Sequence, residues 1–478
     1  MLLVIDIGTS AFKSALYSFG GDCLAAASVP LSVISCEGRH EADPAQWLRA
    51  FAECCARLGP LEKVEALVVS GNGPTLTPVT GEPACGAGGL RLEAAAARLW
   101  LDRRAGEEAA AVSSVMGAFV DSGFFIPKAL EIKNREPELY EKTRVFLSCP
   151  EYLACALTGE ARTVFPAEGF DRWYWNRQVL EKLALDPKKF PPFIVPGDVI
   201  GTLLPQAAVF FGFSKPVPLI AGGPDFFAAI LGSGAVRPGD ACDRAGSSEG
   251  INVCTEKRIG DPRLMSYGHP VKPWWNLSGI ISTTGKAVDW MMTVLALEPG
   301  AQDEFFALAA EAPPGARGLV FLPYLAGERA PIWDPEARGV FMGLGLETGR
   351  AELARAVVEG ICFAIRDVIA VMEEAGAPVR NLRVGGGPAA SGFLNQLKAD
   401  ISGREVLVPA APDVELMGLT ALGAAALGKY ASTAEAASAL IRIGRVYHPD
   451  EKKTARYERL FVGYRELYRS LKNYFAVF

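Results

Sequence analysis

The chain has 478 residues, of which 50% are hydrophobic and 21% are charged. This composition is that of a folded globular protein and not of a disordered one, and the length exceeds what one compact core supports, so we expect two domains. The net charge of -6 at pH 7 argues against a nucleic-acid-binding surface and favours a small-molecule ligand.

The cysteines and histidines argue against a disulfide-stabilised protein and against a histidine-based metal site. The ten cysteines lack Cys-x-x-Cys spacing, which predicts reduced, mostly buried thiols in a cytoplasmic protein. Only three histidines occur, far apart in the sequence, so a histidine-based metal site is not expected. The apolar start Met1–Ile7 has no basic segment and predicts a strand, not a signal peptide. The sequence contains no run of about 18 apolar residues, which a membrane-spanning helix would need, so no membrane partner is expected.

In the first half of the chain, β-rich apolar runs end at glycine-containing turns. They predict strands over residues 2–7, 13–18, 23–34, 64–70 and 217–221. Asp43 as N-cap and Pro44 at the first helical position predict a helix that continues through Cys55. The Pro- and Gly-containing segment from Phe190 to Gly201 predicts a long surface connection.

The second half repeats this alternation. Strands are expected over residues 250–255 and 382–384, and helices over 352–374, 393–401 and 418–427. Strands that alternate with helices predict the α/β class, and we place the domain boundary between residues 243 and 244. The turns Gly8-Thr9-Ser10 and Gly246-Ser247-Ser248 are similar, which hints at an internal duplication on three residues alone.

The turn after the first strand suits phosphate binding. Gly8 leaves room for a phosphate near backbone N–H groups, and the Thr9 and Ser10 hydroxyls can donate to the same oxygens. Asp6 is a candidate Mg²⁺ ligand, and Lys13 a candidate partner of the γ-phosphate. An ordinary hairpin turn is the alternative interpretation of this short motif.

Asp225 follows a predicted strand and begins a predicted helix. A carboxylate beside hydroxyl- and glycine-rich turns suits phosphoryl transfer to an alcohol, in which it takes the alcohol proton while the turns hold nucleotide phosphates. The alternative is that Asp225 only caps the backbone of its helix.

Two further segments carry ligand-binding chemistry. Gly385-Gly386-Gly387 lies between a strand and a helix, where backbone can pass along an adenine or ribose, although a plain glycine-rich connection is the alternative. Trp100 and Asp102 combine an aromatic face with a carboxylate, as sugar sites do, although a solvated helix end is the alternative.

Taken together, these motifs resemble the FGGY family of carbohydrate kinases, within the actin-like ATPase superfamily, over nearly the whole chain. The resemblance rests on Asp6-Ile-Gly-Thr-Ser, Trp100-x-Asp102-x-Arg104, Asp225, Gly246-Ser-Ser, Gly339-Val-Phe-Met-Gly-Leu344 followed by Glu352-Leu-x-x-Ala356-Val-Val-Glu359, and Gly385-Gly-Gly with Ala389, Ser391 and Asn395. It implies two actin-like, ribonuclease H-like domains with a central cleft, and an enzyme that phosphorylates a sugar with ATP and Mg²⁺.

The resemblance also assigns roles to residues. Asp225 is the implied catalytic base. The implied sugar-binding residues are Asn72, Gly73, Trp100, Asp102 and Asp225; the implied nucleotide-binding residues are Gly8, Thr9, Ser10, Lys13, Gly246, Ser247, Ser248, Gly385, Gly386, Gly387, Ala389 and Asn395. The implied metal ligands are Asp6 and Asp225, and a homodimer is the assembly that base rates favour.

The sequence departs from the family pattern at three places, and the last of them leaves the sugar unassigned. Ser247 replaces the usual Thr of the second phosphate loop, Glu131 replaces the usual Trp of one family signature, and Asn72-Gly73-Pro74 replaces the Gln-Met-His of xylulose kinases. An open-chain ketose or polyol is expected as substrate, with a pentulose such as xylulose first. The alternatives are a kinase for glycerol or another polyol, and a non-catalytic sugar or nucleotide sensor on the same fold.

Overall fold

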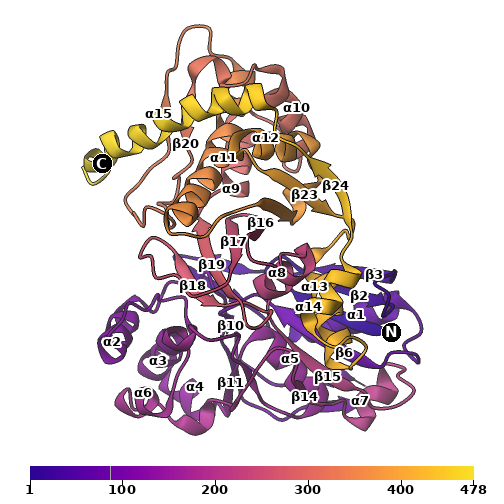
Figure 1. Ribbon diagram of the computed structural model, residues 1–478. Coiled ribbons are helices and arrows are strands. Elements are labelled where there is room, and N and C mark those ends of the chain that lie inside the picture. The colour runs from indigo at the N-terminus through magenta and orange to yellow at the C-terminus, as the bar shows by residue number, and fades with distance from the viewer. Residues whose placement is uncertain (87, 478) are drawn as a thin grey trace. The chain divides into compact units, whose positions relative to one another are not determined.

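The computed structural model describes residues 1–86 and 88–477 as a mixed α/β protein, in agreement with the predicted class (Figure 1). The chain forms two compact units. Unit 1 contains Met1–Gly232 and Glu415–Leu440, and unit 2 contains Ser233–Val414 and Ile441–Phe478.

Unit 1 is built on a six-stranded sheet in the order β14-β15-β6-β1-β2-β3. Its strands are β1 (Leu2–Ile7), β2 (Ala11–Tyr17), β3 (Cys23–Pro30), β4 (Ile34–Cys36), β5 (Arg39–Ala42), β6 (Ala66–Gly71), β7 (Thr77–Val79), β8 (Ala84–Gly86), β9 (Gly89–Arg91), β10 (Ala97–Arg98), β11 (Val145–Leu147), β12 (Thr163–Val164), β13 (Phe193–Ile194), β14 (Val199–Thr202) and β15 (Pro218–Pro224). Its helices are α1 (Ala45–Leu58), α2 (Gly106–Met116), α3 (Phe125–Arg135), α4 (Pro137–Lys142), α5 (Cys149–Thr158), α6 (Arg177–Lys182), α7 (Pro205–Phe210), α8 (Asp225–Ser233), α13 (Val414–Ala426) and α14 (Thr433–Leu440).

The middle of this sheet is parallel. β1 and β6 are buried along their whole length, and both are apolar up to Asp6 and Ser70 near their ends, as expected for strands covered on two faces. β6 pairs in parallel with both β1 and β15, whereas β1, β2 and β3 form an antiparallel series. The core of unit 1 contains side chains from these strands and from α1, α5 and α7.

Unit 2 is built on a seven-stranded sheet in the order β18-β19-β17-β16-β22-β23-β24. Its strands are β16 (Asp240–Ala245), β17 (Glu249–Thr255), β18 (Met265–Gly268), β19 (Trp275–Ile281), β20 (Val320–Leu322), β21 (Val340–Met342), β22 (Asn381–Gly385), β23 (Glu405–Pro409) and β24 (Ile443–Tyr447). Its helices are α9 (Gly285–Val294), α10 (Gln302–Glu311), α11 (Arg350–Glu374), α12 (Gly392–Ser402) and α15 (Glu451–Phe475).

The two sheets share one central topology. In unit 1 the series β3-β2-β1-β6-β15 places three antiparallel strands beside two further parallel strands, and in unit 2 the series β19-β17-β16-β22-β23 repeats the same order and directions. The similar turns of the sequence join the corresponding strands, β1 to β2 and β16 to β17. The topology therefore supports the duplication that three matching residues only suggested.

The division into units differs from the expected boundary at residues 243 and 244. The segment Glu415–Leu440, which was assigned to the C-terminal domain, belongs to unit 1. Its helix α13 lies beside α8 in Figure 1, and the backbones of the two helices approach closely at Gly418. Because the chain returns to its first unit so late, a single cut in the sequence cannot describe the two units.

Several expected elements occur with small shifts at their ends. The helix predicted over residues 352–374 is α11, and Glu352 accepts a hydrogen bond from the Gly349 N–H at its start (3.0 Å). The expected connection from Phe190 to Gly201 instead contains β13 and most of β14. β14 is an edge strand that pairs only with β15, a position that tolerates the proline- and glycine-rich sequence before it. Among the described residues, no helix is long and apolar enough to cross a membrane.

Gly418→Ala tests the packing of the returning segment. A Cβ at Gly418 would lie 1.9 Å from the carbonyl oxygen of Ala228 in α8, so the helices must separate. We expect a loss of about 1–3 kcal/mol in the free energy of unfolding, measured by denaturant titration.

Gly463→Ala is the matched control, because this glycine also lies within a helix but a Cβ there meets nothing within 4 Å. It should stabilise the protein by roughly 0.5–1 kcal/mol through helix propensity. Equal effects of the two substitutions would contradict the close packing of α13 on α8.

Candidate active site

Three parallel strands of unit 1 end at one edge of its sheet. Asp6 of β1 is in register with Ser70 of β6, and Ser70 is in register with Gly223 of β15. Asp225 begins α8 directly after β15. Because the carboxyl ends of parallel strands lie at the same edge, residues far apart in the sequence meet there, as ligand-binding residues do in open α/β sheets.

Asp6 is the most deeply placed carboxylate at this edge. It is buried, and its Oδ1 accepts a hydrogen bond of 2.8 Å from the Ser70 hydroxyl. Burial raises its pKa to about 7, helped by repulsion from Asp225 and Glu415, while Lys13, its cross-strand partner, lowers it. A cation at this position would therefore be favoured, because it would offset three neighbouring negative charges.

Asp225 contributes the second carboxylate. Its Oδ1 accepts a hydrogen bond of 2.7 Å from the Phe226 N–H in the first turn of α8. The half-buried side chain is close enough to Asp6 to raise the Asp6 pKa. The geometry thus contains both features that the sequence left open, a contact with the helix backbone and a second carboxylate beside Asp6.

The turn at Gly8 is tight and connects to the predicted sugar-side motif. The Gly8 N–H donates to the Ala11 carbonyl (2.9 Å), and a Cβ at Gly8 would lie 2.9 Å from that oxygen. Trp100 donates its indole Nε1–H to the Thr9 hydroxyl oxygen (3.0 Å). The Thr9 hydroxyl can still donate its own hydrogen, and Ser10 is exposed.

Asn72 reaches the same edge, but its side chain is used within the protein. It is buried; its Nδ2 donates to the Ile7 carbonyl (3.0 Å) and its Oδ1 accepts from the Thr75 hydroxyl (2.6 Å). Gly73 beside it is exposed. Asn72 therefore shapes the turn and leaves the backbone at Gly73 facing solvent.

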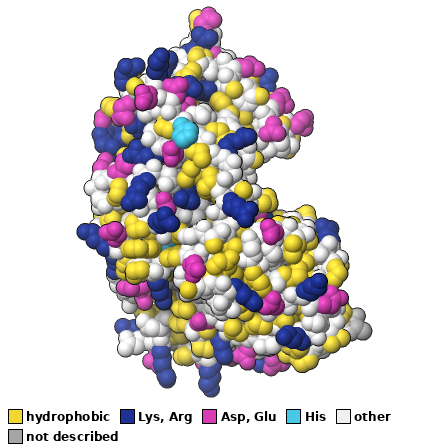
Figure 2. Space-filling model, turned by 45° about the vertical axis from the view of Figure 1, so that its right-hand side comes forward, with side chains coloured by type: hydrophobic (Ala, Val, Ile, Leu, Met, Phe, Trp, Pro, Cys, Tyr) yellow, Lys and Arg dark blue, Asp and Glu magenta, His cyan; other side chains and the backbone are white. Residues whose placement is uncertain are grey.

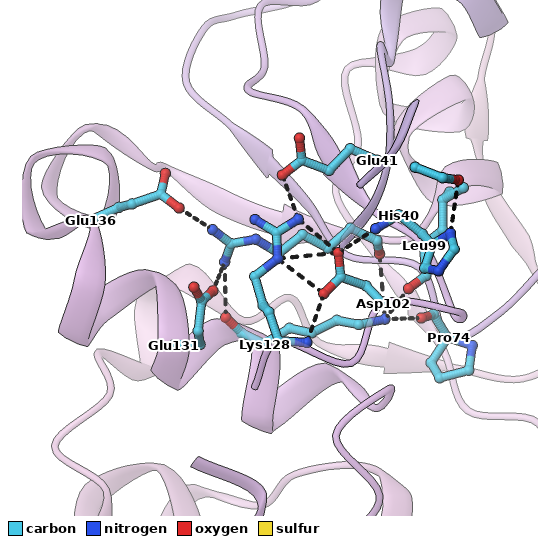
Figure 3. A network of polar contacts seen from close by, with 11 residues as sticks. His40, Glu41, Pro74, Leu99, Asp102, Lys128, Glu131 and Glu136 are labelled. Carbon is cyan, nitrogen blue, oxygen red and sulfur yellow. Dashed lines mark hydrogen bonds and ion pairs between the residues drawn. The ribbon is translucent and has the colours of Figure 1, made fainter. Parts of the chain in front are cut away.

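Asp102 is fully buried and also bound within the protein. Its Oδ2 accepts from the His40 N–H (2.8 Å) and from Arg104 Nη2 (2.7 Å), and Arg104 pairs further with Glu41 (2.6 Å; Figure 3). Burial alone would raise the pKa of Asp102, but the hydrogen bonds from Arg104 and His40 outweigh burial and lower it. Asp102 thus fixes the loop that carries Trp100, a role that the sequence motif does not distinguish from direct sugar contact.

In unit 2 the second turn, Gly246-Ser247-Ser248, is held by α9. The Gly246 carbonyl accepts from the Gly285 N–H (3.0 Å), and the Ser247 carbonyl accepts from the Thr284 N–H (3.2 Å). Gly246 and Ser247 are exposed and Ser248 is half-buried. The two carbonyls are thus used within unit 2, while Gly246 and Ser247 remain accessible to a ligand.

The glycine-rich segment after β22 requires glycine at its centre. Gly386 has φ of 85°, and a Cβ there would lie 2.0 Å from the Ala245 carbonyl oxygen. Asn395 of α12 is buried and donates from Nδ2 to the Ala389 carbonyl (2.7 Å), so it braces the segment from beneath. Gly386 and Gly387 are exposed, as the predicted backbone surface for adenosine requires, whereas Gly385 is buried.

Lys398 connects α12, the helix that carries Asn395, to the two strands that flank the second turn. The sequence analysis did not predict a role for it. It is buried on α12 and pairs with Asp243 of β16 (2.6 Å) and Glu249 of β17 (2.5 Å), which flank the second turn. Burial alone would lower the Lys398 pKa, but the two carboxylates raise it. The sequence analysis also gave no role to Ser70 and Glu415, which lie beside Asp6, or to Lys128 and Arg98, which contact the loop that carries Trp100. Among these, only the helical spacing of Lys128 and Glu131 gave a sequence signal.

The described histidines, cysteines and carboxylates do not form a metal site by themselves. Among residues 1–86 and 88–477, no group of three or more His, Cys, Asp or Glu is arranged to hold a metal ion. Asp6 and Asp225 are two neighbouring carboxylates, and the turns at Gly8 and Gly246 are predicted to bind phosphate; the two carboxylates are a donor set that would suit Mg²⁺ shared with nucleotide phosphates and water.

Comparisons with known proteins agree with this chemistry. The chain matches the N-terminal domain of the FGGY family of carbohydrate kinases over residues 1–232 and the C-terminal domain over residues 244–432. It is 30% identical to the xylulose kinase of Escherichia coli, with 98% of this chain and 99% of the relative covered. Two solved structures from Lactobacillus acidophilus superpose with a TM-score of 0.84 at 25% identity: a gluconate kinase, with 98% of both chains covered, and a ligand-bound xylulose kinase, with 99% of both covered.

Gly386→Ala tests the glycine-rich segment. The new Cβ would collide with the Ala245 carbonyl oxygen at 2.0 Å and displace the segment. We expect the dissociation constant for ATP, measured by calorimetry, to rise about ten-fold or more, the equivalent of roughly 1.4 kcal/mol.

Gly376→Ala is the matched control, because Gly376 has a similar φ of 88° but a Cβ there meets nothing within 4 Å. It carries the same left-handed backbone strain without the collision, so ATP affinity should be retained. Equal losses in both variants would show that backbone strain, and not the adenosine surface, causes the effect.

Proposed function

The chain belongs to the FGGY family of carbohydrate kinases, and from this premise we propose that it transfers the γ-phosphoryl group of ATP to a primary hydroxyl of an open-chain ketopentose. The observation that carries this proposal is the placement of Asp225 beside Asp6 at the edge where β1, β6 and β15 end. Xylulose is the first candidate because the relative at 30% identity is a xylulose kinase.

Asp225 acts as the general base in this proposal. Its carboxylate accepts the hydroxyl proton while the alcohol oxygen forms a bond to the γ-phosphorus and the bond to the β-γ bridging oxygen of ATP breaks, leaving ADP. The proton then passes from Asp225 to solvent. The Gly8 N–H is used within the tight turn, so the turn offers the phosphates the hydroxyls of Thr9 and Ser10, and Lys13 adds a positive charge.

The remaining predicted residues divide between the two substrates. Trp100 offers its ring to the sugar, the exposed backbone at Gly73 offers polar groups, and Asn72 and Asp102 hold these two segments in place. In unit 2, Gly246, Ser247 and Ser248 bind phosphate oxygens, and the Gly385–Ala389 segment, braced by Asn395, binds adenosine. Mg²⁺, held by Asp6 and Asp225, supplies neutralisation of the phosphate charge when it is bound.

Other parts of the proposal concern partners and location. Lys and Arg side chains are interspersed with Asp and Glu over the face drawn in Figure 2, a pattern unlike the one-sign surface of a nucleic-acid-binding protein. We propose a cytoplasmic enzyme with small-molecule ligands and without nucleic-acid or membrane partners; a homodimer remains a prediction.

The direct test measures ADP release from Mg·ATP with xylulose, ribulose, gluconate, glycerol and a no-sugar control. Strong stimulation by a ketopentose supports the proposal. Stimulation by gluconate alone would instead favour the activity of the gluconate kinase that superposes equally well. ATP binding without stimulation by any sugar would favour the non-catalytic sensor.

Asp225→Asn should lower turnover by about 10²-fold or more, because amide nitrogen cannot accept the proton, while sugar affinity changes little. Steady-state kinetics and sugar calorimetry measure the two quantities. Asp450→Asn is the control for a helix-capping role, because Asp450 caps α15 through the N–H groups of Lys452 and Lys453. If both variants keep turnover within a few-fold of wild type, Asp225 is not the base.

Asp6→Asn should raise the Mg²⁺ concentration that gives half-maximal rate by about ten-fold or more, because a charged oxygen ligand is lost. Ser70→Ala removes only the hydrogen bond to Asp6 and keeps the carboxylate, so its effect should be smaller. An unchanged Mg²⁺ dependence in Asp6→Asn would remove Asp6 from the metal site. Magnesium titrations of the initial rate measure both variants.

A further inference from the structure

Lys128 is a fully buried lysine in α3 whose ammonium group contacts three backbone carbonyls (Figure 3). Its Nζ lies 2.7 Å from the Pro74 oxygen, 2.7 Å from the Leu99 oxygen and 3.4 Å from the Arg98 oxygen. An ammonium group has three N–H donors and no acceptor, so three carbonyls match its donors. Burial lowers the pKa of Lys128, and the nearby Asp102 carboxylate acts against that effect.

The three carbonyls belong to the two segments proposed to bind the sugar. Pro74 ends the turn that contains Asn72 and Gly73, and Leu99 directly precedes Trp100. The Leu99 carbonyl also accepts from the Asp102 N–H (3.0 Å), so one oxygen joins Lys128 to the turn that carries the indole. Lys128 therefore connects two chain segments that have no covalent connection near this point.

Arg98 returns the contact from the other direction. Its Nη1 donates to the Lys128 carbonyl (3.2 Å), and its guanidinium forms ion pairs with Glu131 and Glu136. Glu131 is also buried and lies three residues after Lys128, so the two side chains share one face of α3. Burial raises the pKa of Glu131, and Arg98 opposes that shift.

The network explains how this chain accommodates its departure from the family signature. Glu131 stands where that signature usually has Trp, and a lone carboxylate buried there would be costly. Arg98 supplies its counter-charge from β10. The pair forms an ionic contact between α3 and the strand that leads to Trp100.

The connection continues to the phosphate-binding turn. Trp100, one residue after Leu99, donates its indole N–H to the Thr9 hydroxyl oxygen at 3.0 Å. The order of contacts is therefore Lys128 to Leu99, Leu99 to Trp100 through the chain, and Trp100 to Thr9. A shift of the Leu99 carbonyl would move the indole relative to the first phosphate turn.

We propose that Lys128 is a positioning residue that sets the spacing between the Asn72–Pro74 turn and the Leu99–Asp102 loop, with the Arg98–Glu131 pair as its second attachment. Lys128 itself is fully buried, so it would act through these two segments and not by contact with a substrate. The inference rests on the proposed function, because it takes these two segments as the sugar-binding ones. Its effect is on the sugar and on the alignment of its hydroxyl, not on adenosine.

The first arm of the test is kinetic and uses Lys128→Met. Methionine keeps much of the apolar stem but cannot donate to the carbonyls. We expect the KM for the substrate sugar to rise about ten-fold or more and kcat to fall, while the KM for ATP stays within about two-fold. The reason is that small displacements of positioning groups are costly in rate.

Lys189→Met is the matched control. Lys189 is also a buried lysine of unit 1 that donates to backbone carbonyls, those of Thr143 and Glu141, and neither lies in a sugar-side segment. It should lower thermal stability without raising the sugar KM. A sugar KM that rises equally in both variants would mean general loosening of unit 1 and would overturn the proposal.

The second arm does not need activity and separates this inference from the proposed function. Amide hydrogen exchange should accelerate in Lys128→Met over residues 72–76 and 98–104, and in Lys189→Met near residues 141–143 instead. If wild type phosphorylates no sugar but this exchange pattern appears, the proposed function fails while the positioning contact stands. If exchange over 72–76 and 98–104 is unchanged, the positioning role fails.

Glu131→Gln keeps the test decisive if Lys128→Met does not fold. Glutamine preserves the shape of the side chain and leaves Lys128 in place, but it removes the buried counter-charge of Arg98. We expect a smaller rise in the sugar KM, about three-fold, with the same insensitivity of the ATP KM. A sugar KM equal to wild type, together with normal exchange over 98–104, would overturn the role of the pair.

Discussion

The parallel pairing of β6 with β1 on one side and β15 on the other is the constraint on which unit 1 depends. Because the side-chain period of a strand is two, a shift of one residue in either pairing would turn Asp6 or Ser70 to the opposite face. In the observed register the Ser70 hydroxyl donates to Asp6 Oδ1 at 2.8 Å, and a slip would break this buried hydrogen bond. The strand register thereby determines where the carboxylates meet.

The buried charges of unit 1 serve geometry more than stability. Taking Arg98, Glu131, Lys128 and Asp102 out of water is costly, and a buried ion pair is at best a weak contributor to the free energy of folding. What such groups gain is direction: a guanidinium or ammonium group satisfied by named oxygens tolerates few alternative positions. A loop of irregular backbone, such as residues 99–104, benefits most from that restriction because no sheet ladder holds it.

Sequence reasoning found β1, β2, β3, β6, β15, β17 and β22, the long helix α11 and the turns, because periodicity and glycine placement are local signals, but it did not find β16, β19 or β23. It could not find Glu415 beside Asp6, because their proximity arises from a segment that returns to unit 1 late in the chain. It identified Asn72 and Asp102 as site residues but not their internal hydrogen bonds, because burial of a polar side chain is a tertiary property. The pairing of Arg98 with Glu131 could not be predicted either, because the two residues lie far apart in the sequence and meet only in the folded chain.

If Trp100 binds the sugar and Thr9 the phosphate, as proposed, the hydrogen bond between them makes the two binding equilibria interdependent. A sugar that binds against the Trp100 indole would restrict the orientation of the Thr9 hydroxyl. A phosphate that binds the Thr9 hydroxyl would restrict the position of the indole. Thermodynamic reciprocity requires the two effects to be equal in free energy, whichever ligand arrives first. One hydrogen bond between an indole N–H and a threonine oxygen can thus make the binding of a sugar and the binding of a nucleotide favour each other.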